Sequence, residues 1–132
     1  MELSEISDRV AAAITDLERA PDGDTAARGT LALRLRLQAE HASWLVVLAA
    51  RVADEALALS PDDPAARADL ATAAALARSV LQAARACVAG CVARGEELRL
   101  QDEPFDVASA RIDKHVATIE IAARRLTHEV AR

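Results

Sequence analysis

Apolar residues recur at spacings of three and four through most of the chain, which is the repeat of one face of an α-helix. Four segments carry this pattern: residues 4–20, 25–59, 64–100 and 105–132. The three short breaks between them each contain a proline, which cannot continue helical hydrogen bonding. The pattern therefore predicts an all-α protein.

Four helices joined by short reversals fold most simply as an up-down-up-down antiparallel four-helix bundle. We expect one domain over residues 1–132, in which the second and third helices form a long central hairpin. Asp63 is placed to cap the third helix, with Pro64 at its first position. Ser4 is placed to cap the first helix, and Asp24 or Thr25 the second.

The first and last helices each show one apolar stripe and one pair of opposite charges four residues apart. Glu5 and Arg9 form this pair in the first helix, and Glu120 and Arg124 in the last. We expect both stripes to be buried. Their members are Leu3, Ile6, Val10, Ala13 and Leu17, and then Phe105, Ala108, Ile112, Val116, Ile119, Ala123, Leu126 and Val130.

The second segment begins ambiguously, because Leu31 to Leu37 alternates as a strand does. Apolar residues continue at helical spacing to Leu59 without a turn signal, which favours one long helix. We expect two apolar rows on it, both buried against two or three neighbouring helices. The rows are Leu45, Ala49, Val52, Ala56 and Leu59, and Leu33, Leu37, Trp44 and Leu48.

The third segment is rich in alanine and has an apolar inward side interrupted by glycine. Gly90 and Gly95 each weaken a helix interior by about 1 kcal/mol relative to alanine. Either could mark a close contact between helices, and Gly95 could end the helix early. The inward side comprises Leu70, Ala73, Ala77, Val80, Leu81, Ala84, Cys87, Val88, Cys91 and Leu98.

The predicted helices differ in length, and this bears on assembly. At about 1.5 Å per residue the second and third would each reach roughly 50 Å, whereas the first would cover about half of that. Part of the hairpin would then lack a fourth partner. An apolar face left open in this way is commonly closed by a second copy, so we expect a homodimer.

Charge and hydropathy exclude several classes of partner. The formal net charge of −5 repels nucleic acid, so we expect no nucleic-acid binding. No apolar run approaches the roughly 20 residues that cross a bilayer, so we expect no membrane span. The N-terminal MELSEISD lacks the apolar run of a secretory signal, which predicts a cytoplasmic protein.

Cys87 and Cys91, the two cysteines, are spaced so that both side chains leave one face of the third helix. Buried free cysteine usually acts as a small apolar residue, and core packing is the interpretation we favour. Two thiols on one face could instead bind Cu(I) or half of a zinc site, or take part in redox chemistry. Their spacing on a helix is poor for a disulfide with each other.

The expected register adds two histidines to this alternative. Folding the last two helices about Glu103 brings His115 level with Cys91, and folding the hairpin places His41 within about a turn of Cys87. The metal hypothesis therefore has Cys87, Cys91 and His115 as ligands, with His41 as a more distant candidate. For His41, which lies between Leu37 and Trp44, burial with a bonded partner is the simpler interpretation.

No phosphate-binding loop, nucleophile elbow or His-Glu-x-x-His sequence is present, which favours a binding role over an enzyme. Our first hypothesis is a non-enzymatic helical bundle that self-associates and mediates interaction with an unknown protein partner. The second is a small metal-thiolate protein that binds Cu(I) or Zn. The third is an apolar ligand pocket lined by Leu37, Trp44, Val80 and Ile119.

Overall fold

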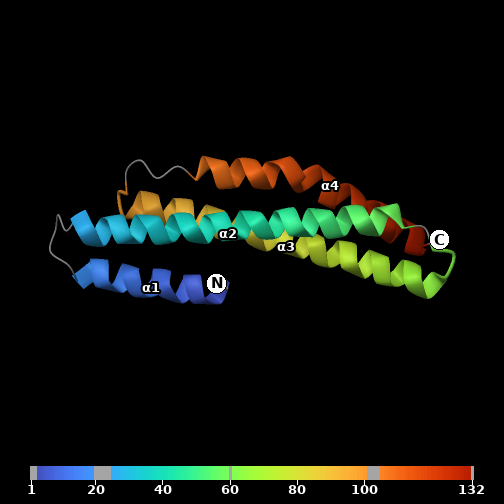
Figure 1. Cartoon of the computed structure of the whole chain (residues 1–132), viewed down its shortest axis with the longest axis horizontal. Coiled ribbons are helices and arrows are strands. Elements are labelled where there is room, and N and C mark those ends of the chain that lie inside the picture. Colours follow the sequence, from blue (N-terminus) through green and yellow to red (C-terminus); the bar gives the residue numbers. More distant parts are fainter. Residues whose placement is uncertain (1–2, 20–24, 60, 101–104, 132) are drawn as a thin grey trace.

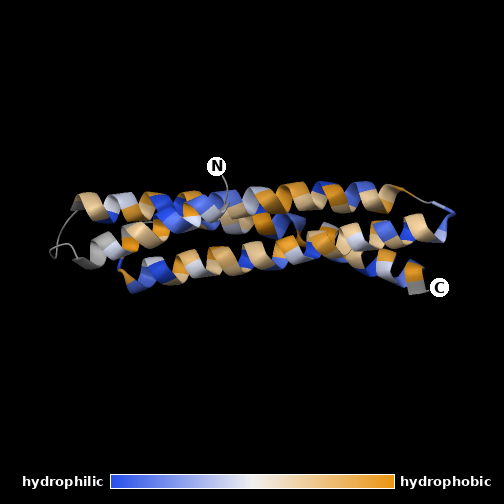
Figure 2. Ribbon diagram, turned by 90° about the horizontal axis from the view of Figure 1, so that it is seen from below, coloured by the Kyte–Doolittle hydropathy of each residue, from blue (hydrophilic) through white to orange (hydrophobic). Residues whose placement is uncertain are grey.

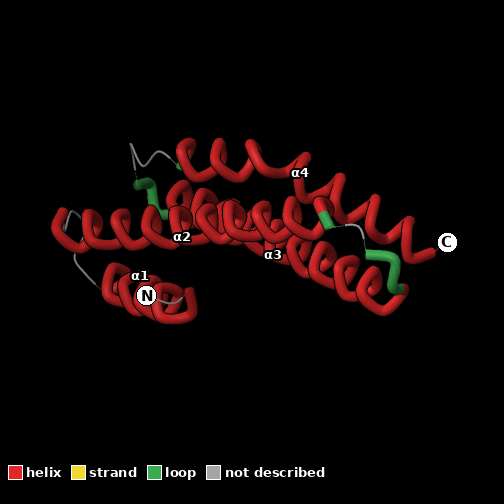
Figure 3. Tube along the Cα trace, turned by 45° about the vertical axis from the view of Figure 1, so that its right-hand side comes forward, coloured by secondary structure: helices red, strands yellow, loops and turns green. Residues whose placement is uncertain are grey.

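The computed structural model describes residues 3–19, 25–59, 61–100 and 105–131, and within them it contains four helices and no strand. Figure 1 shows α1 (Leu3–Arg19), α2 (Thr25–Ala58), α3 (Pro64–Glu97) and α4 (Asp106–Ala131). The predicted all-α class is confirmed (Figure 3). The expected turns at 21–24 and 101–104, and the expected cap Asp24, lie outside the described residues.

The ends of α3 follow from particular residues. Asp63 caps α3 as predicted, because its carboxylate accepts a hydrogen bond from the Ala65 N–H at 3.2 Å, and Pro64 opens the helix. The helix ends at Glu97, three residues earlier than expected, and Arg99 beyond it has a φ of 54°. In contrast to this cap, Ser4 lies within α1 and does not cap it.

Gly95 marks a close contact, one of the two roles expected for it. A Cβ at Gly95 would lie 3.6 Å from Cε2 of Phe105, so the ring packs over the glycine backbone. Gly90 lies on the exposed side of α3 with no such neighbour within 4 Å. Only the second glycine therefore lies against a neighbouring ring, at a distance that an added Cβ would also tolerate.

Helices α2, α3 and α4 each pack against the other two, whereas α1 packs against α2. Figure 1 shows α2 and α3 as a long hairpin, with α1 beside the N-terminal half of α2. The lengths explain this difference, since α1 has 17 residues and α2 has 34. The C-terminal half of α2 extends past the end of α1.

The core is made largely of alanine with a few larger aliphatic residues. Alanine side chains let helix backbones approach closely, and the leucines and isoleucines between them fill the remaining volume. Figure 2 shows apolar residues spread along the helices. The most deeply buried members are Leu31, Leu35, Ala39, Ala42, Val46 and Ala53 of α2, Ala74 and Leu81 of α3, and Ile112, Ile119 and Ala122 of α4.

The expected burial of the large apolar residues on α2 is wrong. Leu33, Leu37, Trp44 and Leu48 are all exposed, and so are Leu45, Val52 and Leu59 of the other row. The physical reason is that α2 turns its alanine-rich side, with Leu31, Leu35 and Val46, toward α3 and α4. The larger residues of both rows are left on the opposite side.

The other predicted stripes are largely confirmed. In α1, Ile6 and Val10 are buried, while the side chains of Leu3, Ala13 and Leu17 lie outside the description. In α4 the stripe is buried or half-buried from Phe105 to Leu126, and Val130 is exposed. The ion pair of Glu5 with Arg9 forms at 2.9 Å.

Helix α3 is long and apolar enough to cross a membrane by length and composition. The central helix of a water-soluble bundle has the same properties, and one side of α3 is buried here against α2 and α4. The structure is thus compatible with a soluble protein.

Candidate functional site

A line of large apolar side chains runs along the outer face of α2 and is the most extensive exposed apolar feature of the described residues. We call it the α2 stripe. Its side chains are between 38% and 59% exposed, which is unusual for six large apolar residues on one helix face and a seventh directly after the helix. Contiguous patches of this kind mark surfaces that bind other molecules. The α2 stripe comprises Leu33, Leu37, Trp44, Leu45, Leu48, Val52 and Leu59.

Two polar residues interrupt the α2 stripe, and α1 borders one end of it. His41 is half-buried and Glu55 is exposed. Near Leu37, Ile6 and Arg9 of α1 form a small crevice of about 30 Å³ with α2. Past the end of α1, the stripe continues from Leu48 to Leu59 without that border.

Trp44, the only tryptophan, is held in place on the α2 stripe by a residue from α4. The guanidinium carbon of Arg111 lies 4.2 Å from the centroid of the Trp44 ring, which is a cation–π contact. Arg111 also donates a hydrogen bond to the Ser43 hydroxyl at 2.8 Å and lies 3.7 Å from the Glu40 carboxylate. Three interactions therefore orient the Arg111 side chain over the tryptophan.

Ser43 completes this connection. It is the one fully buried polar side chain among the described residues, and its hydroxyl donates to the Glu40 carbonyl at 2.7 Å while accepting from Arg111. A buried hydroxyl with both roles satisfied contributes to stability, because neither its donor nor its acceptor is left unpaired. The contacts of Arg111 with Ser43, Glu40 and Trp44 therefore hold α4 against α2.

Sequence reasoning missed Arg111 and chose another partner for Glu120. Arg111 lies beside the Glu40 carboxylate, although the two residues belong to different helices. Glu120 was expected to pair with Arg124, but forms an ion pair with Arg78 of α3 at 3.2 Å. Local spacing cannot reveal such contacts, because the partners are distant in sequence.

The two cysteines lie together on α3, with Cys91 buried and Cys87 half-buried. A hydrogen bond from the Cys91 thiol stabilises the Cys87 thiolate and lowers the pKa of Cys87 from 9.0 to about 7. Burial of Cys87 acts in the opposite direction, and a hydrogen bond with the Gln38 side chain lowers the pKa further. The same interaction and burial raise the pKa of Cys91. Cys87 is thus the more reactive thiol at neutral pH.

The predicted metal ligands are only partly brought together. The contact of Gln38 with Cys87 agrees with the expected register of the hairpin, which places His41 within about a turn of Cys87. Within the described ranges, no three His, Cys, Asp or Glu side chains form a group that could hold a metal ion. The set of Cys87, Cys91 and His115 stays a prediction.

The register of α3 and α4 differs from the expected one. Phe105 packs over Gly95, and Arg78 pairs with Glu120. Both contacts place His115 near the level of Ala84, about two turns from Cys91. These two contacts therefore favour a level for His115 that differs from the expected alignment with Cys91.

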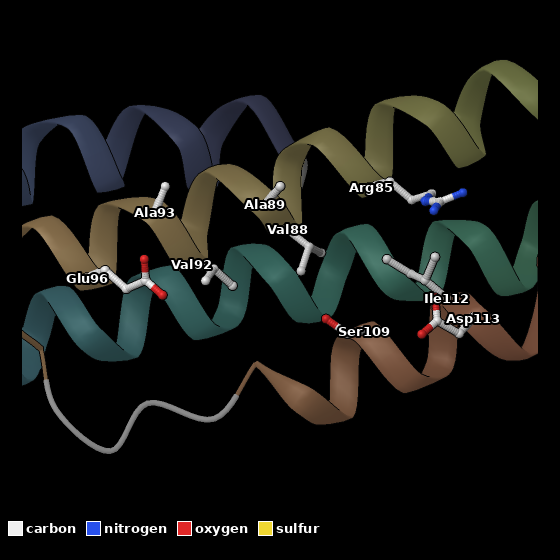
Figure 4. A pocket seen from close by; sticks show the side chains of 9 residues that line it. All are labelled: Arg85, Val88, Ala89, Val92, Ala93, Glu96, Ser109, Ile112 and Asp113. Atoms are coloured by element: carbon white, nitrogen blue, oxygen red, sulfur yellow. The ribbon is translucent and has the colours of Figure 1, made fainter.

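The hypothetical ligand pocket does not form from the four residues expected to line it. Leu37 and Trp44 are exposed on the outer face of α2, whereas Ile119 is fully buried in the core. A separate open cleft of about 330 Å³ lies between α3 and α4 (Figure 4). Its lining is Arg85, Val88, Ala89, Val92, Ala93, Glu96, Ser109, Ile112 and Asp113.

Comparisons of the chain with known protein families, curated proteins and solved structures found no match. The surface and side chains described above therefore carry the functional argument alone.

Proposed function

We propose that the protein is a non-enzymatic up-down-up-down four-helix bundle that self-associates as a homodimer and mediates protein–protein interaction. The observation that carries this proposal is the α2 stripe, which leaves six large apolar side chains exposed on one helix and a seventh, Leu59, just after its end. Removing such surface from water favours association in proportion to the apolar area buried. The proposed interface is therefore the outer face of α2.

Trp44 has the properties of an anchor in such an interface. Tryptophan and arginine are enriched among the residues that dominate binding energy, and Arg111 here stacks on the Trp44 ring. Since the ring is already oriented by Arg111, association loses less side-chain entropy than it would with a freely rotating tryptophan. This supports a pre-organised binding surface.

Light scattering coupled to size-exclusion chromatography tests the proposal. From about 1 µM to about 1 mM, we expect a concentration-dependent dimer for the natural chain and a monomer for Leu48→Glu, which places a charge in the centre of the stripe. Leu76→Glu is the matched control, because Leu76 is 63% exposed on α3, outside the stripe. A natural chain that stays monomeric, or a dimer that tolerates Leu48→Glu, would contradict the proposal.

A second proposed function uses the cysteine pair. The hydrogen bond between the thiols and the lowered pKa of Cys87 favour a thiolate at neutral pH, and thiolate is the form that binds soft metals. Cu(I) and Zn are the candidate metals. With His115 about two turns from Cys91, the proposal rests on the two sulfurs.

Titration of the reduced protein with Cu(I) or Zn(II) against a competing chelator tests this second function. We expect Cys87→Ser with Cys91→Ser to abolish binding, and His115→Ala to leave it unchanged. Metal binding that survives the double serine variant would exclude the cysteine site.

A further inference from the structure

Five members of the α2 stripe, together with its two polar interruptions, are spaced symmetrically about Leu48. The other two members, Leu33 and Leu45, have no apolar residue at the mirror positions. From Leu37 onward, seven of the exposed or half-buried positions, 37, 41, 44, 48, 52, 55 and 59, follow one another in steps of four, three, four, four, three and four. Leu48 lies at the centre of this pattern. The ends are both leucine, and each polar residue, His41 and Glu55, lies seven positions from the centre.

Helical geometry places these positions on one line. At about 100° per residue, all seven lie within about 40° of the direction of Leu48. The line from Leu37 to Leu59 is about 33 Å long at 1.5 Å per residue. The symmetry is therefore a property of a continuous surface, and not only of the sequence.

We infer that a second copy of this chain docks on the α2 stripe in the antiparallel direction, with a twofold axis beside Leu48. This inference rests on the self-association proposed above and specifies its geometry. In a twofold interface, a residue that contacts another is contacted in return by its equivalent. The symmetric spacing meets this requirement: Leu37 faces Leu59 of the second copy, and Trp44 faces Val52.

Polar complementarity favours the antiparallel direction. In this arrangement His41 faces Glu55 of the second copy twice, and an imidazole N–H can donate a hydrogen bond to the carboxylate each time. A parallel pair in register would instead place Glu55 against Glu55, where like charges repel. The two interruptions of the stripe thus become two identical polar contacts.

The half-length of α1 fits the same arrangement. Helix α1 borders the N-terminal half of α2, and the C-terminal half has no such neighbour (Figure 1). Antiparallel pairing sets the N-terminal half of one α2 opposite the C-terminal half of the other. Each α1 then lies next to the C-terminal half of α2 of the second copy, which its own α1 does not border. A parallel pair would instead bring the two α1 helices together and leave both C-terminal halves of α2 without an α1 neighbour.

Disulfide cross-linking tests the geometry. In a background of Cys87→Ser and Cys91→Ser, we expect oxidised Leu48→Cys to form a covalent dimer, because position 48 faces itself across the axis. His41→Cys mixed with Glu55→Cys should cross-link, while neither should do so alone, since positions 41 of the two copies would lie about 21 Å apart. Leu76→Cys is the control and should stay uncross-linked.

A charge exchange tests the polar contacts in the natural cysteine background. We expect His41→Glu and Glu55→Lys each to weaken dimerisation about tenfold, because the first sets two carboxylates opposite each other and the second removes the acceptor of the His41 N–H. The double variant should restore dimerisation, because it sets a carboxylate at position 41 opposite an ammonium group at position 55. A light-scattering dimer in which His41→Cys cross-links to itself would overturn the antiparallel geometry while leaving self-association intact. A chain that is monomeric at all concentrations would overturn both.

Discussion

The two faces of α2 use residues of different size in a way that reverses the usual expectation. The face toward α3 and α4 is mostly alanine, including Ala39, Ala42 and Ala53, whereas the outer face carries Trp44 and Leu48. Small residues inside allow close approach of the helices, and large residues outside offer apolar area to another molecule. The difference separates the face of α2 that stabilises the fold from the face that we propose for association.

The largest expected effect comes from matched leucine truncations on the two faces. Leu35 is 2% exposed and Leu48 is 54% exposed. We expect Leu35→Ala to lower the free energy of unfolding by about 2–5 kcal/mol, because it leaves a cavity. Leu48→Ala should cost the monomer less than about 0.5 kcal/mol. Urea unfolding at low protein concentration measures both, and equal losses would break the comparison.

Enlarging the buried face should also destabilise the fold. Ala53 is fully buried, so Ala53→Leu forces leucine into a close helix contact and should cost about 1–3 kcal/mol. Ala58→Leu, at the exposed end of α2, is the control and should change the free energy of unfolding by less than about 0.5 kcal/mol. A tolerant Ala53 site would show that the alanine face is loosely packed.

Arg111 connects the two faces, and its removal should have a smaller effect. Arg111→Ala removes the hydrogen bond to Ser43 and the cation–π contact with Trp44, for an expected loss of about 1–2 kcal/mol in thermal or urea unfolding. Arg111→Lys keeps the charge but not the planar group, so it should recover only part of the loss. Full recovery by lysine would show that stacking on Trp44 contributes little.

Cys87 of α3 contacts Gln38 of α2, and we expect the state of this thiol to affect reactivity more than stability. Its pKa of about 7 predicts alkylation by iodoacetamide that is half-maximal near pH 7, and Cys91→Ala should move this midpoint toward 9.0. The lowered pKa means that the folded chain favours the Cys87 thiolate more than the unfolded chain does. The thiolate therefore adds its full contribution to the free energy of unfolding above about pH 9, and this contribution is lost as the pH falls through about 7. A midpoint unchanged by Cys91→Ala would contradict the thiol–thiol hydrogen bond.

The sequence was sufficient for the helices but not for the orientation of α2. Pro64 and Asp63 define a helix start by local chemistry, so this boundary was predictable. On α2 both faces are apolar, and ranking residues by hydrophobicity placed Leu48 and Trp44 inside. Which face of α2 is buried depends on which face fits the neighbouring helices. The alanine-rich face is buried because its small side chains allow close packing against α3 and α4.

The candidate site was predictable only in part. The proximity of Cys87 and Cys91 follows from their spacing on one helix. The contact of Arg111 with Trp44 joins two helices, and the level of His115 depends on how α3 and α4 pack against each other, so neither follows from local pattern. Contacts such as Phe105 over Gly95 fix that register only when the helices are packed.

The most direct test of the central claim is the fluorescence emission of Trp44 as a function of protein concentration. Trp44 is the only tryptophan, it is 52% exposed, and it lies on the α2 stripe. We predict that the Trp44 emission of the natural chain and of Leu76→Glu moves to shorter wavelength as protein concentration rises. The midpoint concentration of this shift should equal the midpoint concentration of dimerisation. The emission of Leu48→Glu should stay constant. A dimer that forms without any change in Trp44 emission would place the interface elsewhere and contradict the account.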